Sequence, residues 1–207
     1  MLYQPPHFSG AGRDIALDLM GRHPLATLVS GVAAGDPAVS HAPLLARPDG
    51  ERLVLHGHLA KPNPQWKQWQ DGDAVLAIFH GPDAYVSPFC YEAKEAVPTW
   101  NYAVVHALGR VTLYHDGEAK ERVLKALIDT HDVPYRARWD ELDPAWREKM
   151  KGGIVAFDLA VTRLDVKFKL SQNRSEADRS GVLRALQTGD ARAQELAEWM
   201  QRVMPAG

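Results

Sequence analysis

A stretch of prolines and aromatic residues in the middle of the chain, from Gly81 to His106, constrains the fold most. Its three prolines, Pro82, Pro88 and Pro98, fix φ and have no backbone N–H to donate to a helix or a sheet. The stretch is therefore predicted to be a shaped loop between strands, because neither one continuous helix nor one continuous strand tolerates this spacing of prolines.

The same stretch places large aromatic side chains beside polar ones. The aromatic residues are Tyr85, Phe89, Tyr91, Trp100 and Tyr102, and the polar residues are Lys94, Thr99 and Asn101. Rigid π surfaces next to hydrogen-bonding groups are typical of sites for planar aromatic ligands. The residue types agree equally well with side chains that only anchor a long loop to the core, so other segments have to decide between the two interpretations.

Composition is that of an ordinary globular protein. Of the 207 residues, 45% are hydrophobic and 24% are charged. A chain of this length and hydrophobic content can bury a substantial core. No apolar run reaches the roughly 20 residues that span a bilayer, and the first residues do not resemble a secretory signal. We therefore expect a cytoplasmic protein that does not enter a membrane. The single cysteine, Cys90, cannot form an internal disulfide, in agreement with a reducing compartment.

Charge and motifs exclude several functions. The net charge is −2 and no long basic run occurs, so strong binding to nucleic acid is not indicated, and no helix-turn-helix pattern is present. The chain also lacks a nucleophile elbow, a P-loop, a dinucleotide-binding glycine motif and a paired-carboxylate motif. A self-contained hydrolase is therefore not expected.

Hydrophobic periodicity predicts strands in the middle of the chain and helices around them. The expected strands are 25–30, a hairpin of 38–47 and 52–60, 73–80, a further strand from near Ala84, 102–114, and 154–169 as one long strand or a pair. The expected helices are 14–21 ended by Gly21, 63–70 capped by Asn63, 117–131, a turn or two within 136–151, 178–187 and 190–204. This order predicts an α+β protein built on an antiparallel β-barrel with peripheral and C-terminal helices. We expect one domain over residues 1–207, with a helical C-terminal extension over about 174–207.

Polar residues gather where strand 52–60 ends and the helix at 63–70 is expected to begin. His56 and His58 share a strand face there, and Lys61 and Asn63 follow them. The free N–H groups of a helix N-terminus, with a lysine beside them, favour a phosphate, although ordinary junctions of this kind carry the same residues. The remaining histidines are scattered, so we expect no metal site.

A second polar group lies at the end of strand 154–169. Lys167 and Lys169 share a strand face, and Ser171, Gln172 and Asn173 follow. A cationic strand end of this kind suits a phosphate, the edge of an isoalloxazine ring or a partner subunit, and it is equally typical of a solvated strand end.

Three long segments together resemble the PaiB-type family of FMN-binding negative transcriptional regulators. They are GHLAKPNPQW, YVSPFCYEAKEAVPTWNYAVVHALG and FKLSQNRSEADRSGV, and the opening MLYQPPHF and the strand HPLATLVS are also similar to the family. The resemblance implies a split β-barrel related to pyridoxamine-phosphate oxidase and flavin reductases. It also implies a homodimer with FMN at the subunit interface.

The resemblance further implies which residues bind FMN. The strand end with His56, His58, Lys61 and Asn63 would receive the flavin and its phosphate, and Lys61 would be the charge partner. Trp100, Asn101 and Tyr102 would line the ring from the neighbouring subunit, and Lys169 and Gln172 complete the expected set. No catalytic residue is assigned.

Three functions remain open from the sequence. The first is a homodimeric FMN-binding regulator, with direct DNA binding left open because no DNA-binding motif is present. The second is a flavin-dependent reductase or oxidase that uses FMN and NAD(P)H, in which the cofactor does the chemistry. The third is a haem-binding split barrel, since the chain has nine histidines.

Overall fold

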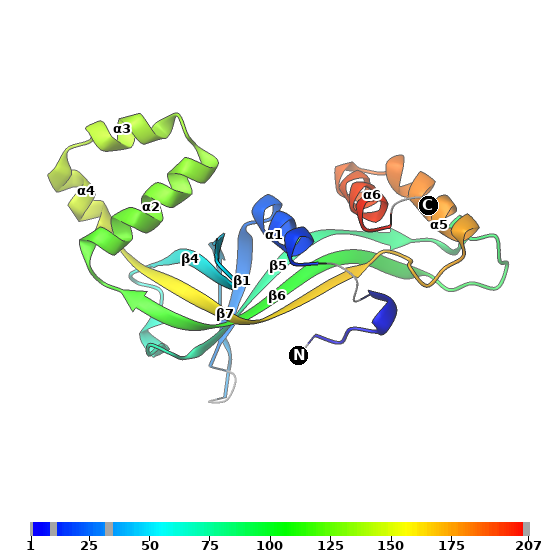
Figure 1. Ribbon diagram of the computed structural model, residues 1–207, viewed down its shortest axis with the longest axis horizontal. Coiled ribbons are helices and arrows are strands. Elements are labelled where there is room, and N and C mark those ends of the chain that lie inside the picture. The colour runs from blue at the N-terminus through cyan, green and yellow to red at the C-terminus, as the bar shows by residue number, and fades with distance from the viewer. Residues whose placement is uncertain (1, 9–11, 32–34, 205–207) are drawn as a thin grey trace. The chain divides into compact units, whose positions relative to one another are not determined.

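The computed structural model describes residues 2–8, 12–31 and 35–204. The chain forms two compact units. The first unit comprises Met1–Arg22, His80–His106 and Asp165–Gly207, and the second comprises His23–Phe79 and Ala107–Leu164. Three long strands run from one unit into the other, namely β5 (Ala74–Val86), β6 (Thr99–Tyr114) and β7 (Ile154–Lys169) (Figure 1).

The second unit contains the short strands of the barrel, β1 (Leu25–Ser30), β2 (Ala38–Pro43), β3 (Leu45–Asp49) and β4 (Arg52–Ala60). In the described part of the chain, seven strands form one sheet in the order β2-β1-β5-β6-β7-β4-β3. The pairs β1–β2, β1–β5, β3–β4 and β4–β7 are antiparallel.

The sheet closes on itself because β2 and β3 stand at its opposite edges although only Leu44 separates them in sequence. A chain can step from one edge to the other in one residue only if the sheet curls until its edges meet. Accordingly β2 lies against β4, and the Leu44 N–H donates to the Pro24 carbonyl at 2.9 Å. The predicted antiparallel barrel is thereby confirmed. The predicted hairpin holds for β3 and β4, whereas the earlier part of its first arm forms the separate edge strand β2.

Alternation along β4 separates the core from the candidate site. Leu55, Gly57 and Leu59 are buried and point into the barrel. A Cβ on Gly57 would lie 2.4 Å from the side chain of Leu44, so only glycine fits this position without movement of its neighbours. The residues between them point to the opposite face, because successive strand residues alternate.

Helices α2 (Gly117–His131), α3 (Tyr135–Glu141) and α4 (Pro144–Lys151) are inserted between β6 and β7. The structure confirms the bounds predicted for α2, and its start is fixed by Asp116, whose carboxylate accepts the Ala119 N–H at 2.7 Å. Asp143 likewise caps α4, with Pro144 in its first turn.

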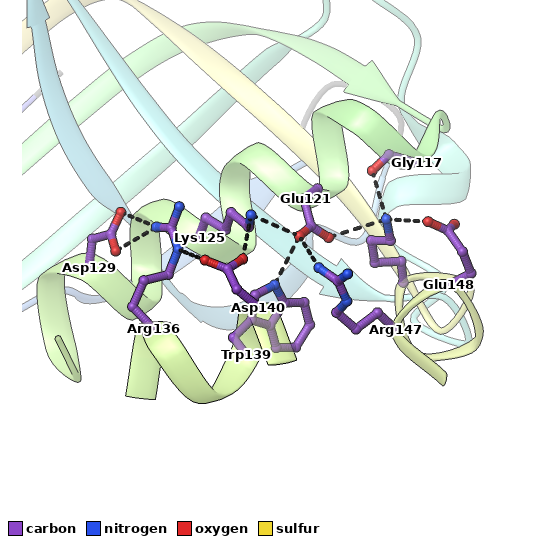
Figure 2. Close-up of polar contacts among 10 residues, drawn as sticks. Gly117, Glu121, Lys125, Asp129, Arg136, Trp139, Asp140, Arg147 and Glu148 are labelled. Atoms are coloured by element: carbon purple, nitrogen blue, oxygen red, sulfur yellow. Dashed lines mark hydrogen bonds and ion pairs between the residues drawn. The ribbon is translucent and has the colours of Figure 1, made fainter. Parts of the chain in front are cut away.

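Ion pairs hold these three helices together (Figure 2). Glu121 on α2 accepts the Trp139 Nε1–H at 2.9 Å and pairs with Arg147 at 3.3 Å and Lys151 at 3.2 Å. A second set of ion pairs joins α2 to α3, among Lys125, Asp129, Arg136 and Asp140.

The first unit packs three helices, α1 (Arg13–Arg22), α5 (Glu176–Gln187) and α6 (Ala191–Val203), with the ends of the long strands (Figure 1). Trp199 on α6 is 1% exposed, and its ring centroid lies 5.2 Å from that of Phe168 on β7. Ser175 and Asp190 cap α5 and α6, which confirms the predicted terminal helices. Gly21 was expected to end α1 in the left-handed conformation, but it lies inside the helix and its φ is not positive.

The helix predicted at 63–70 does not form. The structure has only the short 3₁₀ turn η3 (Trp66–Gln68). Asn63 accepts the Gln65 N–H through its side chain at 2.8 Å, and the Gln65 amide donates to Leu28 and Ala38 carbonyls of the barrel. These tertiary hydrogen bonds hold Gln65 against the strands and override the local helix signal.

The stretch Gly81–His106 is less of a loop than predicted. Its beginning continues β5 and its end belongs to β6, so only residues 87–98, with the 3₁₀ turn η4 (Pro88–Cys90), lie between strands. Pro82 is tolerated within β5 because β1, which pairs with Leu76, Ala77 and Ile78, is too short to reach it.

Candidate functional site

The predicted site residues fall into two groups, one in each unit. His56, His58, Lys61 and Asn63 belong to the second unit. Trp100, Asn101, Tyr102, Lys169 and Gln172 belong to the first unit. We describe each group within its own unit.

His56 is held by a carboxylate that lies opposite it on the neighbouring strand. The β4–β7 register pairs His56 with Asp158, and the His56 Nδ1 lies 2.5 Å from the Asp158 Oδ1. The Tyr114 hydroxyl donates to the other Asp158 oxygen at 3.1 Å, and burial, followed by the charge of Asp158, raises the pKa of Tyr114. A carboxylate at Nδ1 fixes the ring orientation and leaves Nε2 as the atom that can meet a ligand.

His58 lies on the same face of β4 in a more enclosed place. Its Nδ1 is buried and has no hydrogen-bond partner among the described residues. Burial lowers the pKa of His58, so the neutral ring is favoured. An orphaned buried nitrogen is unusual in a folded protein and is a place where a ligand can complete the hydrogen bonding.

Lys61 and Asn63 follow at the end of β4. The Lys61 side chain is exposed, and its backbone N–H donates to the Gly153 carbonyl at 2.8 Å. Asn63 is used internally, since its Nδ2 donates to the Ser40 hydroxyl at 2.8 Å and its Oδ1 accepts from Gln65. Because η3 is a single short turn, no helix N-terminus contributes free N–H groups at this end of β4. The exposed Lys61 supplies positive charge there instead.

In the first unit, Trp100 and Tyr102 lie on one face of β6 and line a cavity of about 420 Å³. His80, Asp83 and His106 line the same cavity. Trp100 is 52% exposed, and the Tyr85 ring meets it edge to face with centroids 6.1 Å apart. The volume and the aromatic wall are those of a site for a planar ring.

Asn101 points to the other face of β6, away from the two aromatic residues. It is fully buried, and its Nδ2 donates to the Ser171 hydroxyl at 2.9 Å. Lys169 donates through Nζ to the Trp100 carbonyl at 2.5 Å and to the Thr99 hydroxyl. Burial, followed by the charges of Lys167 and Arg174, lowers the pKa of Lys169. These residues therefore fix the backbone that carries Trp100.

Gln172 closes the end of β7. Its Oε1 accepts the Leu170 N–H at 2.7 Å and its Nε2 donates to the Phe168 carbonyl at 2.5 Å. Both ends of the amide are thus occupied by the backbone, and the side chain shapes the turn after β7.

Sequence reasoning missed Asp158 and Arg174, and it named Tyr91 only as one of several aromatic side chains. Asp158 is a lone acidic residue inside the apolar run of β7, and that pattern was the signal that could have found it. In the described part of the chain, no group of three or more His, Cys, Asp or Glu residues could hold a metal ion. None of the described helices is both long and apolar enough to cross a membrane.

Residues 2–163 match the model of the family described as "Putative FMN-binding domain". The chain is also 32% identical over 204 residues to "Protease synthase and sporulation protein PAI 2" of Bacillus subtilis (strain 168), covering 97% of each chain. This chain belongs to the PaiB-type FMN-binding-domain family. The predicted family is therefore confirmed, and the matched residues 2–163 include the β4 corner and the aromatic end of β6 that carry the candidate site.

Solved structures confirm the fold of this family member. The FAD and heme binding protein from Mycobacterium smegmatis aligns with a TM-score of 0.56 and 22% identity, over 82% of this chain and 77% of that one. The flavocytochrome Anf3 from Azotobacter vinelandii aligns with a TM-score of 0.53 and 19% identity, over 83% and 78% of the two chains. At these identities the likeness shows the fold, which is the predicted split β-barrel.

Proposed function

We propose that this protein binds FMN and acts as a homodimeric negative transcriptional regulator of the PaiB type. The observation that carries the proposal is membership of the FMN-binding-domain family over residues 2–163. We propose further that the whole chain serves as one FMN-binding domain, with the helices after about residue 174 as its C-terminal extension.

The candidate residues fit the two ends of FMN in different ways. Lys61 is an exposed cation three residues after His58, whose buried Nδ1 has no partner among the described residues, and both suit a phosphate, with His56 and Asn63 in the same segment. Trp100 and Tyr102 offer a π surface to the ring from the neighbouring subunit, in a cavity large enough for it. Asn101, Lys169 and Gln172 act as positioning residues for that surface. Bound FMN would supply redox chemistry, while these side chains bind and orient it.

The homodimer is supported by apolar side chains that stand exposed around the aromatic end of β6. Phe89 is 99% exposed, Val97 68% and Tyr85 54%. Large apolar side chains gathered in one region usually mark an interaction surface. We propose a second copy of this chain as the partner, because it would bring its own surface of Trp100 and Tyr102 to the interface.

The test is titration of the purified full chain with FMN, followed by visible absorbance and flavin fluorescence, with the mass measured by light scattering. We expect saturable quenching of the flavin, because it stacks on Trp100, and the mass of two chains. A folded protein that leaves FMN fluorescence unchanged in excess protein would contradict the cofactor, and a monomer mass would contradict the dimer. Rapid bleaching of the bound flavin by NAD(P)H would contradict the proposal of a regulator and would support a flavin-dependent reductase.

A second candidate is a haem site, which one observation favours. The Asp158 carboxylate orients His56 in the way that carboxylates orient metal-ligating imidazoles. The structural relative from Mycobacterium smegmatis is titled a FAD and heme binding protein. Addition of haemin should give a shifted Soret band that is lost in His56→Ala and kept in His41→Ala. The same spectrum in both variants would contradict this candidate.

A further inference from the structure

A small polar cavity lies at the ends of β6 and β7 in the first unit, separate in its lining from the aromatic cavity. Its volume is about 110 Å³. Its polar lining comes from Tyr91, Thr99, Asn101, Lys169, Ser171, Asn173 and Arg174. Among the described residues no aspartate or glutamate lines it, so two cations face a cavity without an opposing carboxylate.

Tyr91 gives the strongest evidence that this cavity takes a ligand. It is only 8% exposed, and its hydroxyl is buried without a hydrogen-bond partner among the described residues. The Arg174 guanidinium lies 4.4 Å from the centroid of the Tyr91 ring. A buried hydroxyl normally finds an acceptor, so a donor left open beside a guanidinium indicates a missing anionic acceptor.

Lys169 adds a second cation with an unused donor. Its ammonium carries three N–H groups, and the Thr99 hydroxyl and the Trp100 carbonyl accept two of them. Burial and the charges of Lys167 and Arg174 lower the pKa of Lys169, which means that positive charge is crowded here. A bound anion would relieve this repulsion.

The backbone of the cavity is strained at Ser171. Ser171 has a φ of 67°, the left-handed conformation that residues other than glycine adopt rarely, and it alone does so among the described non-glycine residues. Its hydroxyl is paired with the fully buried Asn101. Strained backbone held by buried hydrogen bonds is typical of binding sites.

We propose that this cavity binds one small oxyanion of the phosphate type, through the Tyr91 hydroxyl, the Lys169 ammonium and the Arg174 guanidinium. Its volume suits a single phosphate group and is too small for a flavin ring. The anion is either free inorganic phosphate or the phosphate end of a larger ligand. The proposal does not depend on the flavin proposal, because the aromatic cavity has its own lining.

The test is isothermal titration of the full chain with inorganic phosphate at constant ionic strength, in the wild type, Tyr91→Phe and Tyr85→Phe. Tyr85 is 54% exposed and lines neither cavity, so its variant is the matched control. We expect Tyr91→Phe to weaken phosphate binding by roughly tenfold or more, as loss of a hydrogen bond to a charged group does, and Tyr85→Phe to leave it unchanged. Absence of phosphate binding, or equal binding in the two variants, would overturn the proposal.

Thermal unfolding in phosphate-free buffer gives an independent check. Tyr91→Phe removes only an unpaired hydroxyl, so its Tm should equal or exceed that of the wild type. A clear fall in Tm would show that the hydroxyl already has a protein partner and would also overturn the proposal.

Comparison of FMN with riboflavin distinguishes the two sources of the anion. If Tyr91→Phe weakens FMN but not riboflavin, the cavity takes the phosphate of the flavin. If Tyr91→Phe binds both flavins normally but binds inorganic phosphate more weakly, the anion in this cavity is a ligand separate from the flavin. Normal FMN binding with no phosphate effect anywhere would refute this site and leave the FMN proposal intact.

Discussion

His56 and Asp158 face each other across β4 and β7, with Nδ1 2.5 Å from Oδ1, although 102 residues separate them in sequence. Their side chains are about one-fifth exposed, at 23% and 19%. The pair is fixed by the register of the barrel, and Tyr114 holds the carboxylate from its other oxygen. The histidine ring is thus pre-oriented before any ligand binds.

We expect Asp158→Asn to lower the free energy of unfolding by about 1.5–3 kcal/mol, because a neutral amide replaces the charged acceptor that His56 and Tyr114 both contact. Tyr114→Phe deletes only one of the two contacts to the same carboxylate, the one at 3.1 Å, and should therefore cost less. Urea unfolding at neutral pH measures both. Equal losses in the two variants would mean that the His56–Asp158 contact adds little.

Lys61→Ala should weaken FMN binding by about 1.5–3 kcal/mol, the worth of a charged hydrogen bond to the phosphate. Lys67 on η3 is an exposed lysine nearby in sequence, so Lys67→Ala is the control and should bind FMN normally. Fluorescence titration with FMN gives the affinity of each variant. Riboflavin, which lacks the phosphate, should bind the wild type, Lys61→Ala and Lys67→Ala equally well. Unchanged FMN affinity in Lys61→Ala would rule out its role at the phosphate.

Trp100→Ala should weaken FMN binding by about 0.5–1.5 kcal/mol, the value of one aromatic stacking contact, with little loss of stability because Trp100 is half exposed. Trp146 on α4 is similarly exposed at 44%, and Trp146→Ala should leave affinity unchanged. Paired FMN titrations and thermal melts test this. A fall in Tm without loss of affinity would identify Trp100 as a structural residue only.

Glu121 should make the stability of the α2–α4 insertion depend on pH. Burial would raise the pKa of Glu121, but hydrogen bonds from Trp139 and Lys151 outweigh it and hold the pKa below its ordinary 4.5. The stabilisation is therefore present above pH 4.5 and is lost as the pH falls through the lower folded-state pKa. We expect Glu121→Gln to have a lower Tm than the wild type at pH 7.

The same comparison at an acid pH below 4.5 should show a smaller difference, because the stabilisation is lost as the pH falls through the lowered pKa of Glu121. Glu118→Gln, at an exposed position in the first turn of α2, is the control and should not reproduce this pattern. A difference between Glu121→Gln and the wild type that is the same at both pH values would contradict the prediction.

Gly181→Ala should destabilise the first unit, because a Cβ there would lie 2.1 Å from the Cys90 carbonyl oxygen. Backbone has to move to admit the methyl group, and overpacking of this kind typically costs about 1–3 kcal/mol. Gly21→Ala is the matched control, since a Cβ on that helical glycine meets nothing within 4 Å. It should instead stabilise the protein by about 0.5–1 kcal/mol. Urea unfolding should therefore shift in opposite directions in the two variants.

Much of the fold could be predicted because local signals encode it. Asp116 and the apolar spacing of 117–131 define α2, and alternation over 154–169 defines β7. The prediction of a helix at 63–70 was wrong because tertiary contacts override the local signal there. Its cap and tryptophans favour a helix locally, but Gln65 gains hydrogen bonds to the barrel that the isolated segment does not have. The same limit applies to the prolines of 81–106, since sequence alone does not show that β5 passes beyond its partner β1 at Pro82.

By itself the sequence determined most of the strand and helix types, because periodicity and capping act over a few residues, and its three long segments identified the family by their resemblance to it. Only the tertiary structure decided which residues meet. Sheet register placed Asp158 against His56, and the turn after β7 brought Arg174 to Tyr91. These relationships join residues far apart in the chain, and they depend on the curl and register of the whole sheet, which no local pattern records.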